Sequence, residues 1–329
     1  MKMLNLAEIP IQSVDFRHIH TEPGPFCMSF GFELQSLIFS IENVGLINPP
    51  LIVEKRPGEM DIVAGYRRIK ALIQLKTTSI PCKILSHSEF SPFDCLLVNF
   101  YDNLVSREFN DVEKGMLLNR LQEHISKTMI LEQFMPLLGL PCHRPTLDLF
   151  MRVENELNAE IKEYLAHGGL SLKTARLLLE VEEDSRSTVF HLISSLKLTM
   201  NQQLQLVDYL IDISHTTGKP IPLLLDDIQL NRIIAEGDTN KPQTAKAVFE
   251  LLRHTRYPRL SNAEKDFKRV ISRMRLPKGV HVKAPPFFET PQYRLEVMFK
   301  EGGELKDKLY RLSRNQELDN LGDPWKKNH

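Results

Sequence analysis

The sequence predicts a multidomain α+β protein, and three observations lead to this prediction. Its 329 residues are more than one hydrophobic core usually organises. The first third alternates short apolar runs of strand length with amphipathic segments, whereas the following residues carry helical periodicity. Two more strand-like runs and a helical run come near the end of the chain. We therefore expect an α/β N-domain over residues 1–110, an all-α middle domain over 111–235, and a small ββα C-terminal element within 236–329.

The composition is that of an ordinary soluble globular protein, with 42% hydrophobic and 26% charged residues. Forty-two basic residues balance forty-two acidic ones, so that nucleic-acid binding would have to rest on local clusters of charge. No apolar run approaches eighteen residues, and the N-terminal sequence does not resemble a signal peptide. We therefore expect a cytoplasmic protein without a membrane segment.

Neither cysteine nor histidine spacing indicates a metal site of its own. Four cysteines are widely separated and form no C-x-x-C pair, and the eleven histidines show no H-E-x-x-H spacing. We expect reduced thiols and no zinc site.

The expected N-domain elements follow one another closely. Residues 7–20 begin with an edge strand, and the apolar positions of residues 33–42 fall on one face of a helix that Gly45 ends. A strand is expected at 51–54. The run Asp61–Leu85 then reads as strand, glycine turn, helix and strand.

The glycine turn in this run predicts an anion site. Gly65 lets the backbone approach a ligand closely, and the helix that follows presents its N–H groups. Arg67 and Arg68 add guanidinium groups that suit phosphate oxygens. The alternative is a pair of surface charges on an ordinary helix, and spacing alone favours it because G-x-R-R is a short pattern.

Three motifs favour the anion site over ordinary surface charges, because in their order along the chain they resemble the ParB family. The first follows a strand and leads into an Ala-containing helix ending near Ile-Pro. The second joins a helix to a strand through Gly-Leu and proline. The third holds an acidic residue, Asn, Arg and a helix start. The matching positions are Gly65, Arg67, Arg68, Ala71, Ile80 and Pro81; Ser40, Ile41, Gly45, Leu46, Asn48 and Pro49; and Asp102, Asn103, Arg107, Asn110 and Glu113.

The resemblance covers about residues 7–215 and implies a ParB/sulfiredoxin-like N-domain that binds CTP with Mg²⁺. It implies phosphate contacts from Gly65, Tyr66, Arg67, Arg68, Asn103 and Arg107. It places the nucleobase near Ile47, Asn48 and Pro49, and Mg²⁺ near Asp102 and Asn103. In two departures from the pattern, Asp102 replaces the usual glutamate, and Arg107 lies one position late with Ser106 in its place. Both departures argue more strongly against nucleotide hydrolysis than against nucleotide binding. Alternatively, Asn110 and Glu113 form only the capping box of a helix.

The middle domain is expected to be helical, with segments at 112–125, 130–138 and 145–157. Two of these joined by a turn at Gly139 resemble the helix-turn-helix that the ParB family has here. Its DNA-facing side chains would be Arg144, Thr146 and Arg152. An ordinary helical hairpin is the alternative. Further helices are expected at 172–183 and 200–213.

The last part of the chain begins with a linker at Gly237–Pro242. Residues 253–278 then hold nine Lys or Arg, among which we nominate Lys268 and Arg269 for DNA contact. A solvated helix face is the commoner reason for such a run. Strands at 280–283 and 293–299 and a helix at 305–312 are too few for a core of their own. We expect them to pack on another element or on their twin in a homodimer.

The resemblance thus implies a nucleoid-associated ParB-like protein that uses CTP to close a dimeric clamp on DNA during chromosome or plasmid partition, with a ParA-type ATPase as a candidate partner. It also implies a candidate CTPase activity, for which the sequence identifies no catalytic residue. One alternative is a nucleotide-using kinase or nuclease of the same superfamily. The other is a nucleotide-free transcription adaptor. Sulfiredoxin-type chemistry is disfavoured, because no cysteine stands near Gly65 in that family's manner.

Overall fold

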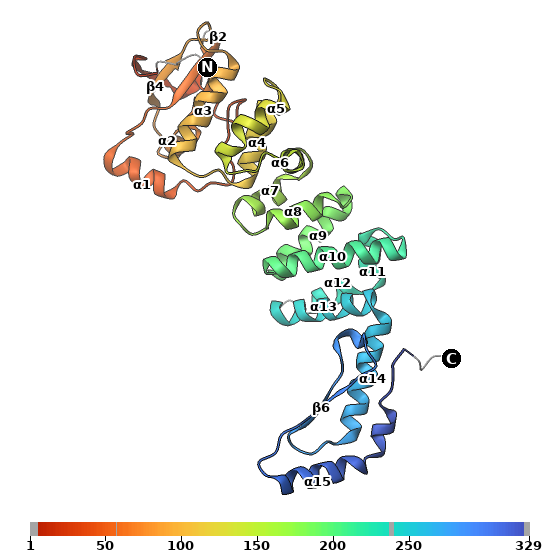
Figure 1. Ribbon diagram of the computed structural model, residues 1–329. Helices are drawn as coiled ribbons and strands as arrows, with labels where there is room; N and C mark the ends of the chain where they lie inside the picture. The colour runs from red at the N-terminus through yellow and green to blue at the C-terminus, as the bar shows by residue number, and fades with distance from the viewer. Residues whose placement is uncertain (1–5, 57, 237–239, 326–329) are drawn as a thin grey trace. The chain divides into compact units, whose positions relative to one another are not determined.

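The computed structural model describes residues 6–56, 58–236 and 240–325, and over these it confirms a mixed α and β fold. Fifteen α-helices accompany a four-stranded and a two-stranded sheet in this part of the chain (Figure 1). The chain forms two compact units, residues 1–186 and 187–329, which are described separately. The domain boundaries expected at 110 and 235 stay predictions. Among the described residues, no helix combines the length and the apolar character that crossing a membrane requires.

The first unit contains the four-stranded sheet. Its strands are β1 (Ile11–Asp15), β2 (Leu51–Arg56), β3 (Glu59–Ala64) and β4 (Ser79–Leu85), in the order β1-β4-β2-β3. β1 pairs antiparallel with β4, β2 antiparallel with β3, and β2 parallel with β4. The expected edge position of the first strand is confirmed, because β1 lies at one end of the sheet.

Helices cover both faces of this sheet. Alternate strand residues point to opposite faces, so that Ile52 and Ile62 pack with α2 (Tyr66–Gln74) while their neighbours pack on the other side. There, α3 (Pro92–Ser106) and α4 (Asp111–Leu121) bury a second apolar cluster (Figure 1). Burying each large aliphatic side chain contributes about 1.5–3 kcal/mol. The two clusters hold α2 and α3 on opposite faces of the sheet, next to the end of β3 where the candidate site lies.

The expected strand–turn–helix–strand unit is confirmed as β3, Gly65, α2 and β4. The preceding helix, α1 (Gln35–Val44), ends as expected at Gly45, whose N–H bonds to the Ile41 carbonyl. The sequence patterns described above do not predict helix α3, although its start carries a signal: Ser91 and Asp94 form a capping box and Pro92 occupies the first turn.

The remaining helices of the first unit correct two expectations. Residues 130–138 form a π-helical turn, Ile130–Phe134, and a 3-10 turn, Pro136–Leu138, instead of a regular helix. Pro136 lacks the N–H that a regular α-helix would need at this position. After these turns come α6 (Arg144–Glu156), α7 (Ala159–Ala166) and α8 (Leu172–Leu179), and α8 ends four residues earlier than expected. The short α5 (Lys127–Met129) precedes them, and α9 (Glu183–Leu196) runs across the division between the units.

The second unit begins with further helices: α10 (Met200–Thr217), α11 (Ile221–Asp227), α12 (Leu230–Glu236), α13 (Lys241–Arg256) and α14 (Pro258–Met274). Of the expected linker at 237–242, residues 237–239 lie outside the described part of the chain. The rest of it is no linker, because Asn240 caps α13 through the Gln243 N–H and Pro242 lies in the first turn.

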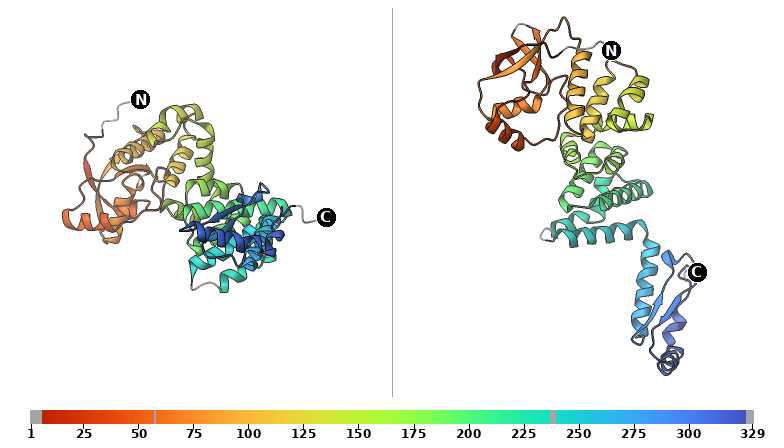
Figure 2. Two further views of the ribbon diagram at one scale, coloured as in Figure 1. Left: turned by 60° about the horizontal axis from the view of Figure 1, so that its bottom comes forward. Right: turned by 60° about the vertical axis from the view of Figure 1, so that its left-hand side comes forward.

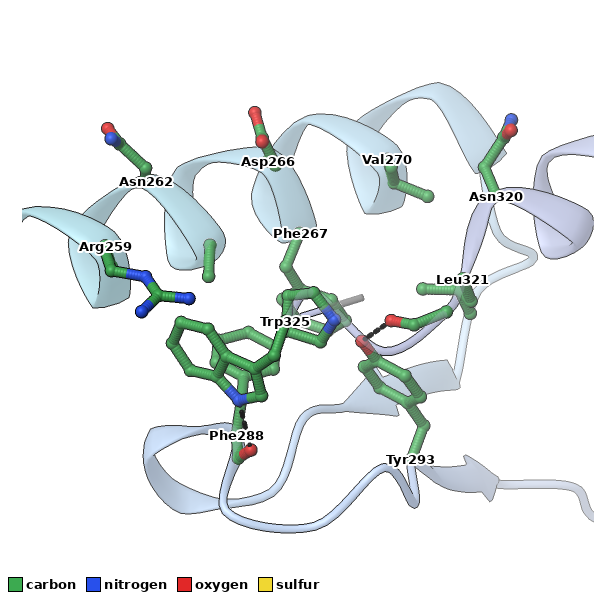
Figure 3. A pocket seen from close by; sticks show the side chains of 13 residues that line it. Arg259, Asn262, Asp266, Phe267, Val270, Phe288, Tyr293, Asn320, Leu321 and Trp325 are labelled. Atoms are coloured by element: carbon green, nitrogen blue, oxygen red, sulfur yellow. Dashed lines mark hydrogen bonds between the residues drawn. The ribbon is translucent and has the colours of Figure 1, made fainter. Parts of the chain in front are cut away.

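The C-terminal strands and helix are confirmed as β5 (Val280–Lys283), β6 (Arg294–Val297) and α15 (Gly302–Ser313). The residues that join the two strands pack against α14, which runs alongside the β5–β6 ribbon (Figures 1 and 2). Phe267 of α14 stacks on Tyr293 at a centroid distance of 5.6 Å. Trp325 donates from Nε1 to the Phe288 carbonyl at 2.8 Å, which closes this aromatic cluster around a cavity of about 160 Å³ (Figure 3).

Candidate functional site

A cavity of about 250 Å³ lies in the first unit, where β3 ends and α2 begins. It brings together side chains from the three motifs that the sequence singles out. The predicted site residues that line it are Asn48, Gly65, Tyr66, Arg67, Arg68, Asp102, Asn103 and Arg107. Of the predicted nucleobase region, Ile47 lies outside this lining and is 73% exposed, while the Pro49 carbonyl lies 3.4 Å from Arg68 Nη1.

Gly65 has the backbone conformation that the turn requires. Its φ is +92°, and a Cβ built on it would lie 3.1 Å from the Pro50 Cα. Any other residue would therefore be both strained and crowded. Gly65 is the N-cap of α2, and no side chain accepts a hydrogen bond from the N–H groups of the first turn of this helix. Together with the helix dipole, these N–H groups favour an anion.

Arg67 is held at the edge of the cavity. Its Nη2 donates to Glu113 Oε1 at 2.7 Å, and its guanidinium lies 4.9 Å from the centroid of the Phe32 ring. Its Nε is buried and has no hydrogen-bond partner among the described residues. Burial lowers the pKa of Arg67, and the positive charge of Arg107 lowers it further. An unsatisfied, buried guanidinium N–H is a group that an anion would satisfy.

Arg68 joins two elements across the cavity. Its Nη1 donates to the Asn48 carbonyl at 2.7 Å, and its Nη2 donates to Asp102 Oδ2 at 3.0 Å. Asp102, a predicted metal ligand, therefore neutralises a predicted phosphate ligand.

Arg107 uses all three of its guanidinium nitrogens within the protein. Its Nε donates to Asn103 Oδ1 at 2.7 Å, its Nη2 donates to the Met28 carbonyl at 3.0 Å, and its Nη1 donates to Glu113 Oε2. It caps the C-terminal end of α3 with an extended backbone, while Ser106 lines the cavity. The one-residue shift noted in the sequence therefore places Arg107 just beyond the helix.

Glu113 makes contacts with the site that the sequence analysis does not predict. The predicted capping box of α4 is confirmed: Asn110 Oδ1 accepts from the Glu113 N–H at 2.9 Å, and Glu113 Oε2 accepts from the Asn110 N–H at 3.1 Å. The same carboxylate also pairs with Arg67 and Arg107 and is 1% exposed. Arg67 is 46 residues away in the chain, and the sequence holds no signal for this contact.

Asp102 and Asn103 offer one carboxylate and one carboxamide oxygen to a metal. In the described part of the chain, no group of three or more His, Cys, Asp or Glu could hold a metal ion. Mg²⁺ usually takes one or two carboxylates and completes its shell with waters and substrate phosphates. The two residues thus fit an Mg²⁺ that is bound together with a polyphosphate, and they do not form a cation cage by themselves.

The side chains of the first unit that are predicted to contact DNA differ in how strongly they are bonded to other residues of the chain. Arg144, in the first turn of α6, is 71% exposed and lies 3.9 Å from Asp148. Thr146 Oγ1 lies 3.5 Å from His143 Nδ1. Arg152 is tied down, because it contacts Glu156, Glu180 and the Leu179 carbonyl at 2.8, 3.2 and 2.6 Å.

The basic stretch of the second unit divides in the same way. Arg253 pairs with Glu264, and Arg256 pairs with Asp208 and Asp212. Lys268 is exposed, and Arg269 is exposed but pairs with Asp266 at 3.0 Å. Several exposed side chains form no ion pair within the described residues, namely Lys265, Lys268, Arg273, Arg275 and Lys278.

Comparison with known proteins identifies the first part of the chain. Residues 4–97 match the family model of the ParB N-terminal domain. This region is a ParB N-terminal domain. The resemblance inferred from the three motifs is thereby confirmed.

Several known proteins are similar to about half of the chain. A probable chromosome-partitioning protein ParB of Vibrio cholerae is 28% identical over 174 residues, which are 53% of this chain and 57% of that protein. One from Chlamydia muridarum is 28% identical over 203 residues, or 59% and 69% of the two chains. A nucleoid occlusion protein of a Geobacillus strain is 25% identical over 154 residues, or 47% and 52%. The chain thus spans little more than half the length of the Vibrio ParB.

Two solved structures of truncated ParB from Caulobacter crescentus also align. The complex with the centromeric parS site covers 60% of this chain and 98% of its own, at 19% identity and a TM-score of 0.33. The complex with CTP-γ-S covers 55% and 98%, at 20% identity and a TM-score of 0.26.

Proposed function

We propose that the ParB N-terminal domain of this chain binds CTP with Mg²⁺, and that the chain is a DNA-binding protein of chromosome or plasmid partition. The observation that supports the proposal best is the convergence of Arg67, Arg68 and the uncapped start of α2 on one cavity beside Gly65. These groups suit a polyphosphate. The identity of the base and the link to partition are taken from the family.

The charges of the site suit a ligand with several negative charges. Three arginines face two carboxylates around the cavity, so part of the positive charge is not neutralised internally. Each charge-assisted hydrogen bond to a phosphate contributes about 1.5–3 kcal/mol. Gly65, Tyr66, Arg67 and Arg68 would contact the phosphates, and Asp102 and Asn103 would hold Mg²⁺ against them. The base would lie toward Ile47–Pro49.

DNA would bind through exposed basic side chains. In the first unit the basic contact would be Arg144 at the start of α6, with the hydroxyl of Thr146 beside it, in the segment predicted as a helix-turn-helix. In the second unit they lie along α14, around Lys268 and Arg269. Arg152 would contribute less, because its guanidinium already holds α6 to α8.

A homodimer through the C-terminal element completes the proposal. Large apolar side chains of β6, α15 and the residues between them are exposed: Leu295, Met298, Phe299, Leu309 and Tyr310 are 47–61% exposed. A second copy of the chain would cover them. Such a dimer, positioned on DNA in the cytoplasm, is what a ParA-type ATPase would act on. CTP hydrolysis would be a separate activity.

A nucleotide-free adaptor is the second candidate, and one observation favours it. Each of the three arginines forms an ion pair with a carboxylate of the chain, so none of them lacks a charged partner when no ligand is bound. An enzyme such as a kinase or nuclease has no comparable support.

Calorimetric titration with CTP and Mg²⁺ of the wild type and Arg68→Ala tests the proposal. We expect saturable binding by the wild type and about ten- to a hundredfold weaker binding by the variant. Lys70→Ala is the matched control, because it removes a positive charge from the same helix at a side chain outside the cavity lining. Equal affinity of R68A and wild type would contradict the proposed phosphate site. No binding by either protein would support the adaptor.

A further inference from the structure

Glu113 contacts two arginines of the cavity without lining it. Its carboxylate receives four hydrogen bonds, from Arg67 Nη2, Arg107 Nη1 and the N–H groups of Phe30 and Asn110. Both carboxylate oxygens are therefore satisfied, which a buried charge requires. Simple capping of α4 needs only the contact with Asn110, so the two arginines remain to be explained.

The arginine contacts solve an electrostatic problem of the site. Burial lowers the pKa of Arg67, and the nearby positive charge of Arg107 lowers it further. A carboxylate between them offsets the repulsion. It also fixes one end of the Arg67 guanidinium, while the buried Nε of that group has no partner among the described residues.

We infer that Glu113 is a positioning residue of the nucleotide site, whose carboxylate holds Arg67 so that its remaining N–H groups can bind a phosphate. The inference rests on the proposed nucleotide binding. It adds to the site a residue of α4, which follows the helix that carries Asp102 and Asn103. The position of the Arg67 guanidinium, and with it the proposed phosphate contact, would therefore depend on the first turn of α4.

The opposite role would be competition, in which the Glu113 carboxylate takes the place of a phosphate and must leave before a nucleotide binds. Two observations disfavour it. Glu113 is 1% exposed and lies outside the cavity lining. Its departure would also leave the Phe30 and Asn110 N–H groups without their acceptor, which opposes the movement.

Glu113→Gln tests the inference, because it removes the charge and keeps the shape of the side chain. We expect E113Q to bind CTP with Mg²⁺ about tenfold more weakly than the wild type by calorimetry. The matched control is Asp94→Asn in the capping box of α3, where Asp94 accepts from the Ser91 N–H at 2.9 Å and pairs with no arginine of the described residues. D94N weakens the same kind of cap, and we expect it to keep wild-type affinity.

A double-mutant cycle with Arg67→Ala separates positioning from a general loss of structure. If Glu113 acts through Arg67, E113Q lowers the affinity of the wild type but not that of R67A. An equal loss in both backgrounds would overturn the inference, and so would tighter binding by E113Q, which indicates competition. If E113Q does not fold by circular dichroism, Glu113→Asp enters the same cycle with the same criteria. Absence of CTP binding by the wild type would refute the proposed function, and this inference with it.

Discussion

Arg68 and Asp102 form an ion pair of 3.0 Å between α2 and α3, across the cavity beside Gly65. The pair joins a residue proposed to bind phosphate to a residue proposed to bind Mg²⁺. Its side chains are 19% and 44% exposed, so the pair itself adds little to stability. The proposed binding would couple the two residues, because a metal bound to Asp102 would free Arg68 to contact the phosphates.

Asp102→Ala separates these two effects. Without Mg²⁺, we expect D102A to bind CTP at least as tightly as the wild type, because Arg68 has lost its internal partner. With Mg²⁺, we expect the wild type to gain affinity and the variant to gain much less. Calorimetry with and without a chelator measures both. Asp15→Ala is the control, since Asp15 pairs with Arg17 at 2.8 Å outside the cavity lining. An unchanged Mg²⁺ dependence in D102A would limit Asp102 to the ion pair.

Gly65→Ala tests the geometry of the turn. An alanine at φ +92° costs about 1–2 kcal/mol in strain, and its Cβ would also crowd the Pro50 Cα at 3.1 Å. We expect a lower free energy of unfolding in urea and weaker nucleotide binding. Gly139→Ala is matched in strain, at φ +69°, but a Cβ there meets no atom within 4 Å. It should lose stability without losing affinity. Equal affinity losses in G65A and G139A would show that strain alone is responsible.

The salt dependence of DNA binding tests whether the basic side chains of α14 contact DNA. Lys and Arg that neutralise phosphates release counterions, so log affinity should fall with log salt by about 0.9 per phosphate. We expect Lys268→Glu with Arg269→Glu to flatten this slope and to weaken binding to specific and random duplexes alike. Lys246→Glu with Lys306→Glu makes the same change of charge at exposed positions on α13 and α15 and is the control. A slope that K268E/R269E leaves at the wild-type value would remove α14 from the DNA interface.

The buried thiols predict an alkaline loss of stability. Burial raises the pKa of Cys82 to about 12 and that of Cys95 to about 11, from an ordinary value of 9.0. Unfolded thiols ionise at lower pH than these folded ones, so this contribution is complete below about pH 9 and is lost as pH rises toward 11–12. Cys82→Ala should therefore reduce the decline of unfolding free energy above pH 9, measured in urea. An unchanged decline would contradict this assignment.

Thiol reagents provide an independent check on the same burial. Cys142 is exposed, whereas Cys27, Cys82 and Cys95 are buried. We expect Cys142 to react rapidly with an aromatic disulfide reagent at pH 8 and the three buried thiols to react only as the protein opens. Cys142→Ser should abolish the rapid phase. A rapid phase that persists in C142S would show that a buried thiol is accessible.

The local patterns of the sequence predict the elements around the site, because strand alternation, the glycine turn and helix caps are decided by neighbouring residues. Gly65, Gly45 and the Asn110–Glu113 capping box are of this kind. Contacts between distant segments leave no local pattern. The pairing of Glu113 with Arg67 is one such contact. Another is the buried Asn99 side chain, which donates to the Phe26 carbonyl at 2.6 Å and also to that of Val63.

The expectations that needed correction also have physical reasons. The apolar periodicity of residues 130–138 predicts a helix, but Pro136 interrupts its hydrogen bonds and gives π and 3-10 turns. The polar composition near Pro242 suggests a linker, although Asn240 and a proline in the first turn are also how a helix begins. Composition alone does not distinguish these two outcomes.

The most direct test of the proposed nucleotide binding is an equilibrium titration of the wild-type chain with each of the four ribonucleoside triphosphates, with and without Mg²⁺. We expect saturable binding of CTP that Mg²⁺ strengthens, with weaker binding of the other three. Absence of saturable binding by all four, by a chain that is folded by circular dichroism, would contradict it.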